Sequence, residues 1–140
     1  MEKTLRIDVA DVLLEQIRGT AGRNVLKGGL GQDALVFNVK PTKRNVDKIE
    51  SFTVKDDCVW LENAIYKGLG RKGSLDKPLV LKKDAFFTGT KAGDAEDRII
   101  YDRKSGKLWY DEDGRGEKTQ VLIAQMQKNL RLTEKDFFAI

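Results

Sequence analysis

The residues of this sequence that could do chemistry are carboxylates set among glycines. The 140-residue chain has one cysteine, Cys58, and no histidine. This composition excludes internal disulfides, most zinc sites and every histidine-dependent catalytic triad. Oxygen-ligand chemistry remains, and it suits calcium or magnesium. The 22 Asp and Glu residues and 13 glycines leave room for such a site.

The clearest cation motif is an internal repeat. Residues 19–27, GTAGRNVLK, align with residues 28–36, GGLGQDALV. The second copy fits G-G-x-G-x-D-x-U-x at every fixed position, whereas the first has Thr20 and Asn24 at two of them. In such a nonapeptide a glycine turn directs carbonyls and a carboxylate at a cation. The repeat therefore predicts calcium ligands at Gly19, Asn24, Gly28, Leu30 and Asp33.

Each nonapeptide also predicts a short strand after its turn. The apolar residue of that strand, Leu26 in the first copy and Leu35 in the second, is expected in the core. An ordinary glycine-rich hairpin loop is the alternative for the same residues.

A second acidic motif, D-x-D-G-x-G, runs from Asp111 to Gly116. A partial calcium site at Asp111 and Asp113 is one interpretation, and a tight turn without metal is the favoured one. An EF-hand is excluded because Arg115 and Leu122 stand where ligands belong. The nearby acids at 94, 96, 97 and 102 are expected to form surface ion pairs with Lys91 and Arg98.

The elements that position these motifs are mostly strands. Short apolar or β-branched runs separated by Gly, Asp and Asn predict strands over residues 35–39, 49–54, 59–61, 79–81, 98–101, 108–110 and 121–126. Residues 102–106 predict a hairpin loop, and residues 68–78 a long surface loop. Apolar residues at helical spacing behind Asp8 predict a short helix over residues 8–17.

Length and composition favour one globular domain, since hydrophobic residues make up 40% and charged residues 34%. The net charge of +4 is small and the basic residues are scattered, so we expect no nucleic-acid partner. No stretch is long and apolar enough for membrane insertion, and the N-terminal residues do not resemble a signal peptide. Cys58, beside Val59 and Trp60, is expected to be a buried structural thiol.

The later part of the chain carries an ordered set of motifs: FFTGTKAGDAEDRIIYD at 86–102, GKLWYDEDGRG at 106–116 and DFFAI at 136–140. This order resembles the segment that follows the glycine-rich repeats in serralysins and other RTX, or hemolysin-type calcium-binding, exoproteins. Residues 46–52 and 57–61 also resemble strands of that family. Together with the nonapeptides, the likeness covers residues 19–140, nearly the whole chain.

The resemblance implies a mainly β fold in a single domain, residues 1–140. A helical lead-in over 1–18 would precede a short parallel β-roll turn over 19–36, and antiparallel strands over 37–140 would cap it and hold the secretion signal. It also implies a non-enzymatic, calcium-dependent, extracellular module exported by type I secretion machinery. A calcium in that family bridges a repeat and the next but one, so residues 10–18 or another molecule would complete a site here.

The export signal that the resemblance implies is uncleaved and lies at Asp136, Phe137, Phe138, Ala139 and Ile140. Thr133 could cap one helical turn before it, with Asp136 at the capping-box position. A terminal strand that buries Phe137 and Ile140 is the structural alternative, and both can hold, because an exporter would meet the unfolded chain. The resemblance leaves open a larger parent protein or self-association.

Two other functions stay open from the sequence. One is an RTX-derived adaptor that no longer depends on calcium and holds an acidic partner through lysine-rich loops at 40–48 and 67–77. The other is a small hydrolase that uses Asp111 and Asp113 as a metal site. No zincin motif is present, and no carboxylate pair is singled out as an acid and base couple.

Overall fold

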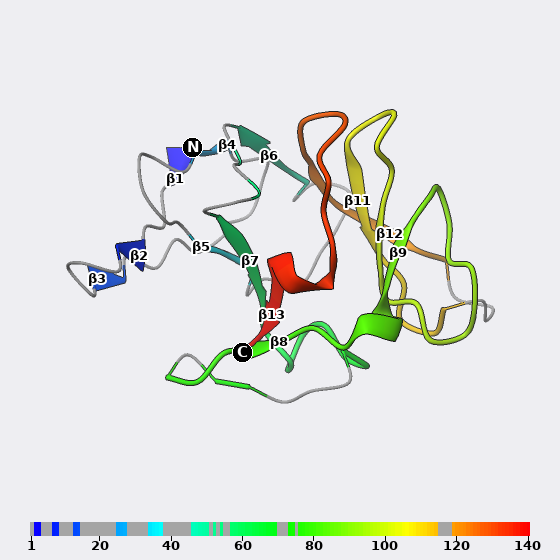
Figure 1. Ribbon diagram of the computed structural model, residues 1–140, viewed down its shortest axis with the longest axis horizontal. Coiled ribbons are helices and arrows are strands. Elements are labelled where there is room, and N and C mark those ends of the chain that lie inside the picture. Colours follow the sequence, from blue (N-terminus) through cyan, green and yellow to red (C-terminus); the bar gives the residue numbers. More distant parts are fainter. Residues whose placement is uncertain are drawn as a thin grey trace.

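The computed structural model describes residues 2–3, 7–8, 13–14, 25–27, 34–37, 46–50, 52, 54, 57–69, 73–74, 76–114 and 119–140. Within these ranges the chain is mainly β, with two single-turn 3-10 helices, η1 (Lys83–Ala85) and η2 (Glu134–Asp136). The strands form one large sheet, one smaller sheet and a two-stranded pair, as Figure 1 shows.

The large sheet is mixed. Its order is β1 (Glu2–Lys3), β4 (Val25–Lys27), β6 (Asp47–Glu50), β12 (Val121–Gln125), β11 (Lys107–Tyr110), β10 (Ile99–Tyr101) and β9 (Phe86–Thr88). The first four strands in this order, β1, β4, β6 and β12, run parallel to one another. From β12 to β10 the chain forms an antiparallel meander, and β9 adds to β10 in parallel.

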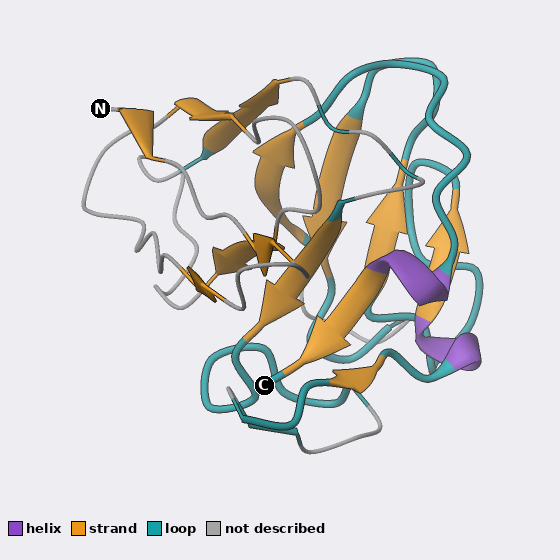
Figure 2. Cartoon of the chain, turned by 60° about the vertical axis from the view of Figure 1, so that its left-hand side comes forward, coloured by secondary structure: helices purple, strands orange, loops and turns teal. Residues whose placement is uncertain are grey.

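The smaller sheet carries the C-terminus. Its order is β5 (Ala34–Phe37), β7 (Cys58–Leu61), β13 (Phe137–Ala139) and β8 (Leu79–Val80). The strands β5, β7 and β13 are parallel, and β8 is antiparallel to β13. In the turned view of Figure 2 the C-terminal strand lies inside this sheet, with strands on both sides.

Successive strands from β4 to β7 alternate between the two sheets. β4 and β6 are parallel neighbours in the large sheet, with Leu26 opposite Ile49. β5 and β7 are parallel neighbours in the smaller sheet, with Leu35 opposite Val59. Parallel strands cannot be joined by a tight hairpin and need a crossover. Here the crossover from one strand to its parallel neighbour is a strand of the other sheet.

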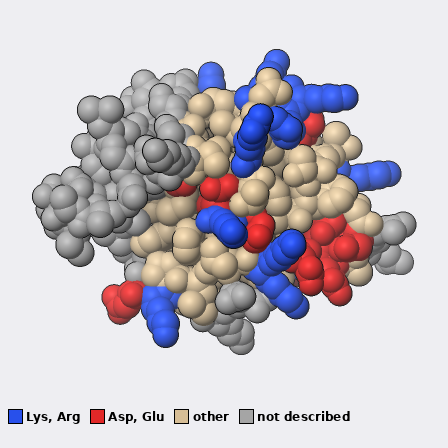
Figure 3. Space-filling model, viewed as in Figure 1, with Lys and Arg blue, Asp and Glu red and all other residues tan. Residues whose placement is uncertain are grey.

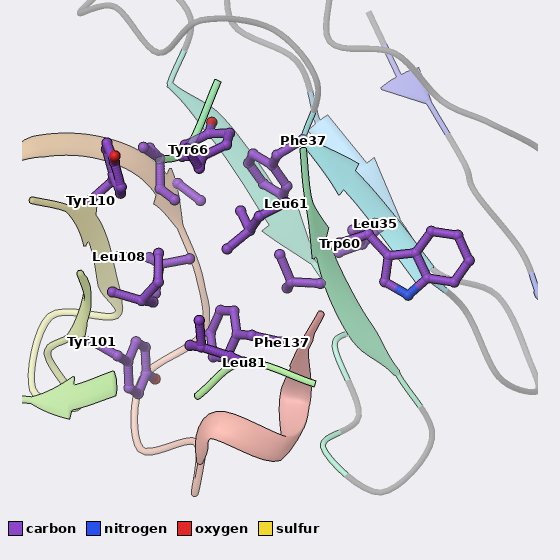
Figure 4. Close-up of a cluster of buried hydrophobic side chains, with 14 of the residues drawn as sticks. Leu35, Phe37, Trp60, Leu61, Tyr66, Leu81, Tyr101, Leu108, Tyr110 and Phe137 are labelled. Atoms are coloured by element: carbon purple, nitrogen blue, oxygen red, sulfur yellow. The ribbon is translucent and has the colours of Figure 1, made fainter. Parts of the chain in front are cut away.

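One hydrophobic core lies between the two sheets (Figure 4). Leu35, Val59 and Phe137 are cross-strand partners in the smaller sheet, and none is more than 2% exposed. Tyr101 and Leu108 from the meander approach them from the large sheet. Trp60 points away from this cluster, because successive residues of a strand face opposite sides.

The strands predicted over 35–39, 59–61, 79–81, 98–101, 108–110 and 121–126 are confirmed in type and place, with ends that shift by one or two residues. The strand predicted over 49–54 overlaps β6 only at residues 49 and 50. The predicted hairpin loop is also confirmed, since the Gly106 amide donates to the Asp102 carbonyl at 2.7 Å and the Asp102 amide to the Lys107 carbonyl at 2.9 Å. The expectation of purely antiparallel strands over residues 37–140 is wrong. β6, β7 and β13 each have parallel neighbours, because the chain returns to each sheet only after crossing the other.

The structure does not confirm the helix predicted over residues 8–17. The described residues of that segment, 8, 13 and 14, lie in strands. β2 (Ile7–Asp8) and β3 (Leu13–Leu14) pair as antiparallel strands. A helix of ten residues makes few hydrogen bonds of its own and needs tertiary packing to persist in water. In this pair of strands Ile7 lies opposite Leu14.

Candidate functional site

The expected calcium ligands of the nonapeptides, Gly19, Asn24, Gly28, Leu30 and Asp33, lie outside the described residues. The strands that flank the second turn are described. Val25–Lys27 belongs to the large sheet and Ala34–Phe37 to the smaller one, so residues 28–33 connect the two sheets. The expected core position of Leu35 is confirmed at 2% exposure, and Leu26 lies in a strand as expected.

Asp111 and Asp113 lie just after β11, in a tight turn. Asp111 is 5% exposed, its amide donates to the Arg98 carbonyl at 2.8 Å, and its Oδ1 accepts from the Asp113 amide at 3.2 Å. Burial raises the pKa of Asp111, and the neighbouring Asp113 carboxylate raises it further. The turn is the favoured interpretation of the D-x-D-G-x-G motif, and the structure shows that it forms. Calcium binding there stays a prediction.

The turn is closed by Gly114, which has a φ of +66°. A methyl group at this glycine would lie 2.5 Å from the Ala95 carbonyl carbon and 2.6 Å from the Asp94 carbonyl oxygen. The backbone of residues 111–114 therefore packs directly on the backbone of residues 94–95. Two acidic turns that are separate in sequence meet at this corner of the molecule.

The second acidic turn is organised by Asp97, which is 3% exposed. One of its carboxylate oxygens, Oδ2, accepts from the Gly93 amide at 2.6 Å and from the Asp94 amide at 3.1 Å. Burial raises the pKa of Asp97, and these two hydrogen bonds oppose that rise. Asp94 Oδ1 in turn accepts from the Glu96 and Asp97 amides, so the turn is held by its own carboxylates.

Arg98 does not pair with these carboxylates, contrary to expectation. Its Nη1 donates to the Ala95 carbonyl at 2.8 Å and to the Asp97 carbonyl at 3.1 Å. Two carbonyl oxygens of the acidic turn, those of Ala95 and Asp97, are thus bound by the guanidinium group. Asp94 and Glu96 are exposed residues. Acidic side chains gather at the right of Figure 3.

No three carboxylate or thiolate side chains of the described residues converge as a metal-binding group. Residues 115–118, which follow the Asp111 turn, are not described. Cys58 forms no disulfide and packs against the core, but it is half-buried and not fully buried as predicted.

The C-terminal segment is built into the fold. The predicted capping box is confirmed: the Thr133 side chain accepts from the Lys135 amide at 3.2 Å, and Asp136 Oδ2 accepts from the Thr133 amide at 2.7 Å. Asp136 is 8% exposed, and burial raises its pKa. Phe137 and Ala139 are fully buried, and Phe138, on the opposite face of the strand, is half-buried.

Ile140 completes the segment. Its amide donates to the Leu61 carbonyl at 2.9 Å, and its carbonyl accepts from the Asn63 backbone amide at 2.8 Å and from Asn63 Nδ2 at 3.0 Å. The predicted terminal strand that buries Phe137 and Ile140 is therefore confirmed.

The lysine-rich loops are only partly described. Lys48 from the first loop and Lys67 and Lys77 from the second are exposed, and Leu69 is buried beneath the second loop. A different basic group was missed from the sequence. Arg103, Lys104, Lys128 and Arg131 are all exposed and lie on two loops that contact each other. Their separation in sequence gave no sign of this.

No helix among the described residues has the length and apolar character needed to cross a membrane. The chain has no match among protein-family models, curated proteins or solved structures.

Proposed function

We propose that this chain is the C-terminal module of an RTX-type exported protein: a non-enzymatic β-roll end that folds on calcium after type I secretion and carries the export signal. The module would act outside the cell, with the type I secretion machinery as its partner during export.

The alternation of β4, β5, β6 and β7 between two sheets is the observation that carries this proposal. A β-roll is a coil in which each nonapeptide adds one strand, first to one sheet and then to the other. Val25–Lys27 and Ala34–Phe37 come from consecutive nonapeptides and lie in different sheets. The next two strands add to them in parallel.

The residues between β4 and β5 are suited to hold calcium. Gly28 and Leu30 would offer backbone carbonyls and Asp33 a carboxylate, with Gly19 and Asn24 as the counterparts in the first copy. Hard oxygen donors of this kind are what calcium prefers. When bound, the ion neutralises the carboxylate and holds together carbonyls that would otherwise face one another.

Calcium would act as a folding switch between compartments. A ligand that binds only the folded state adds RT ln(1 + [L]/Kd) to stability, about 2.7 kcal/mol when its concentration is a hundred times Kd. Low calcium inside the cell would leave the chain unfolded and competent for export. Higher calcium outside would favour the folded module.

The C-terminal segment supports the same order of events. Phe137, Ala139 and Ile140 are buried in the folded module, so an exporter could read them only before folding. Because folding would hide the signal, the exporter could no longer bind the protein once it has been exported and has folded.

Thermal unfolding in about 5 mM calcium, in the same concentration of magnesium and in chelator tests the proposal. Calcium should raise the melting temperature by at least about 5 °C, and magnesium by much less. Asp33→Asn removes the charged ligand at nearly constant size and should reduce the calcium shift. Equal melting in all three conditions would contradict the proposal and favour the calcium-independent adaptor.

A further inference from the structure

Two loops at one end of the meander form a single braced surface. One is the hairpin loop between β10 and β11, and the other follows β12 and leads to η2. The Asn129 amide donates to the Arg103 carbonyl at 2.8 Å, and the Met126 amide to the Gly106 carbonyl at 2.8 Å. Gln125 Nε2 also donates to the Ser105 carbonyl at 2.6 Å.

A buried tyrosine fixes the second loop from below. The Tyr101 ring is fully buried, and its hydroxyl donates to the Gln127 carbonyl at 2.5 Å and accepts from the Leu130 amide at 3.2 Å. The two loops are therefore held by backbone bonds to each other and by a core side chain. Groups on this surface are positioned before any ligand arrives, which lowers the entropy cost of binding.

The surface carries four exposed cations, Arg103, Lys104, Lys128 and Arg131, which we call the basic platform. Two of them interact electrostatically with neighbouring residues, Lys104 with Asp102 and Arg103 with Tyr101. In Figure 3 basic side chains gather at the top, where Figure 1 places these two loops.

One carboxylate, that of Asp102, lies beside the basic platform and interacts electrostatically with Lys104. Asp102 Oδ2 accepts from the Ser105 hydroxyl at 2.6 Å, and its Oδ1 accepts from the Lys104 amide at 3.1 Å. The Ser105 hydrogen bond holds the pKa of Asp102 below its ordinary value. The carboxylate thus holds the hairpin turn and keeps its negative charge, but the four cations outnumber it and leave the surface net positive.

We infer that the basic platform binds an acidic polysaccharide chain that bears carboxylate or sulfate groups. Clustered cations on rigid loops attract a polyanion and gain affinity as they displace its counterions. The choice of a polysaccharide rests on the proposed extracellular function, because such polymers coat cell surfaces. The cation cluster itself does not depend on that function.

The side chains of the basic platform favour charge recognition alone. Bases are read by aromatic stacking or by a helix or strand pair inserted into a groove. The platform consists of two turns, and its exposed groups are ammonium and guanidinium ions. Phe87, the exposed large hydrophobic residue among the described ones, lies on β9 and not on this surface. The platform therefore offers neither base stacking nor an apolar anchor for a lipid bilayer.

The test measures binding of a fluorescent heparin oligosaccharide by anisotropy, with calcium present and folding checked by circular dichroism. The variant Lys104→Gln/Lys128→Gln/Arg131→Gln should bind about ten-fold more weakly than the wild type and show a shallower salt dependence. Its control is Lys82→Gln/Lys83→Gln/Lys91→Gln, which removes the same charge from exposed lysines elsewhere and should bind within about two-fold of the wild type.

Three results would overturn the inference: no heparin binding by the wild type at low salt, equal loss in both variants, or tighter binding of a DNA duplex of equal charge. The first result would show that the surface does not bind this polyanion. The second would show that binding depends on overall charge and not on the basic platform. The third would show that the basic platform prefers nucleic acid. These readouts use the folded chain and are separate from the calcium shift. If the chain binds heparin through the basic platform but calcium does not raise its melting temperature, the proposed function is contradicted and the heparin site is still supported.

Discussion

At the scale of single residues, three of the four buried carboxylates among the described residues serve as turn caps. Asp97, Asp111 and Asp136 are each less than a tenth exposed, and each accepts backbone amides within four residues of itself. Burial raises the pKa of all three. The sequence shows acids among glycines, but it does not show that local amides already use their oxygens.

Asp97 should be the most important of these caps. Asp97→Ala leaves the Gly93 and Asp94 amides without their acceptor at a buried site, so the free energy of unfolding should fall by about 1–3 kcal/mol. Glu96→Ala in the same turn removes an exposed carboxylate and should change stability by less than about 0.5 kcal/mol. Urea unfolding of the two variants measures the difference. Equal losses would show that Asp97 does not hold the turn.

Asp111 should make stability depend on pH. Because its pKa is raised in the folded state, the folded state binds the proton more tightly than the unfolded chain does. Its contribution is fully present below the ordinary value of 3.8 and is lost as pH rises through the raised pKa. The wild type should therefore gain stability over Asp111→Asn as pH falls from neutral toward 3.8.

Asparagine keeps the acceptor for the Asp113 amide, so the comparison isolates the proton. Denaturant unfolding at a series of pH values checks it. The raised pKa would be contradicted if the free energy of unfolding of the wild type, minus that of Asp111→Asn, stays constant or falls on acidification.

At the scale of elements, sequence patterns predicted strands well and their partners poorly. The runs at 58–61 and 107–110 are short and β-branched or aromatic, and such runs identify strands locally. Whether β7 lies beside β5 and β13 depends on a chain that leaves the sheet and returns, which no local pattern records. The basic platform was not predicted for the same reason. It depends on a contact between two loops that are separate in sequence, in which the Asn129 amide donates to the Arg103 carbonyl.

The braced loops make Gly106 a sensitive position. It has a φ of +79°, and a methyl group there would collide with the Met126 carbonyl oxygen, which is backbone and cannot move aside. Gly106→Ala should lower the free energy of unfolding by more than about 2 kcal/mol. The added methyl group in the control Gly89→Ala would meet only the exposed Phe87 ring, 2.8 Å away, and should cost much less. Similar midpoints for the two variants would show that the loops are not braced as described.

At the scale of the whole molecule, the strands β5 to β7, the meander and the C-terminal strand share one core. β12 extends the large sheet beside β6, and β13 extends the smaller one beside β7. β12 and β13 thus each lie within a sheet, with a paired strand on both sides.

The two phenylalanines of the terminal strand should separate folding from export. Phe137→Ala empties a fully buried position and should cost about 3–5 kcal/mol, whereas Phe138→Ala, at a half-buried position, should cost clearly less. An exporter that reads the unfolded chain would treat the two variants alike. Export of a fused passenger by a type I system, compared with thermal stability, checks both parts. If Phe137→Ala reduces export more than Phe138→Ala does, in step with its larger loss of stability, the exporter reads folded structure and this part of the prediction is wrong.

The central claim, that nonapeptide turns hold this fold through calcium, is tested most directly by calorimetric titration of the metal-free chain with calcium. We predict saturable binding with at least one ion per chain, accompanied by the appearance of strand signal in circular dichroism. Asp33→Asn should weaken that binding, and Asp113→Asn should leave it unchanged. No heat of binding and a fully formed β spectrum in chelator would contradict the claim.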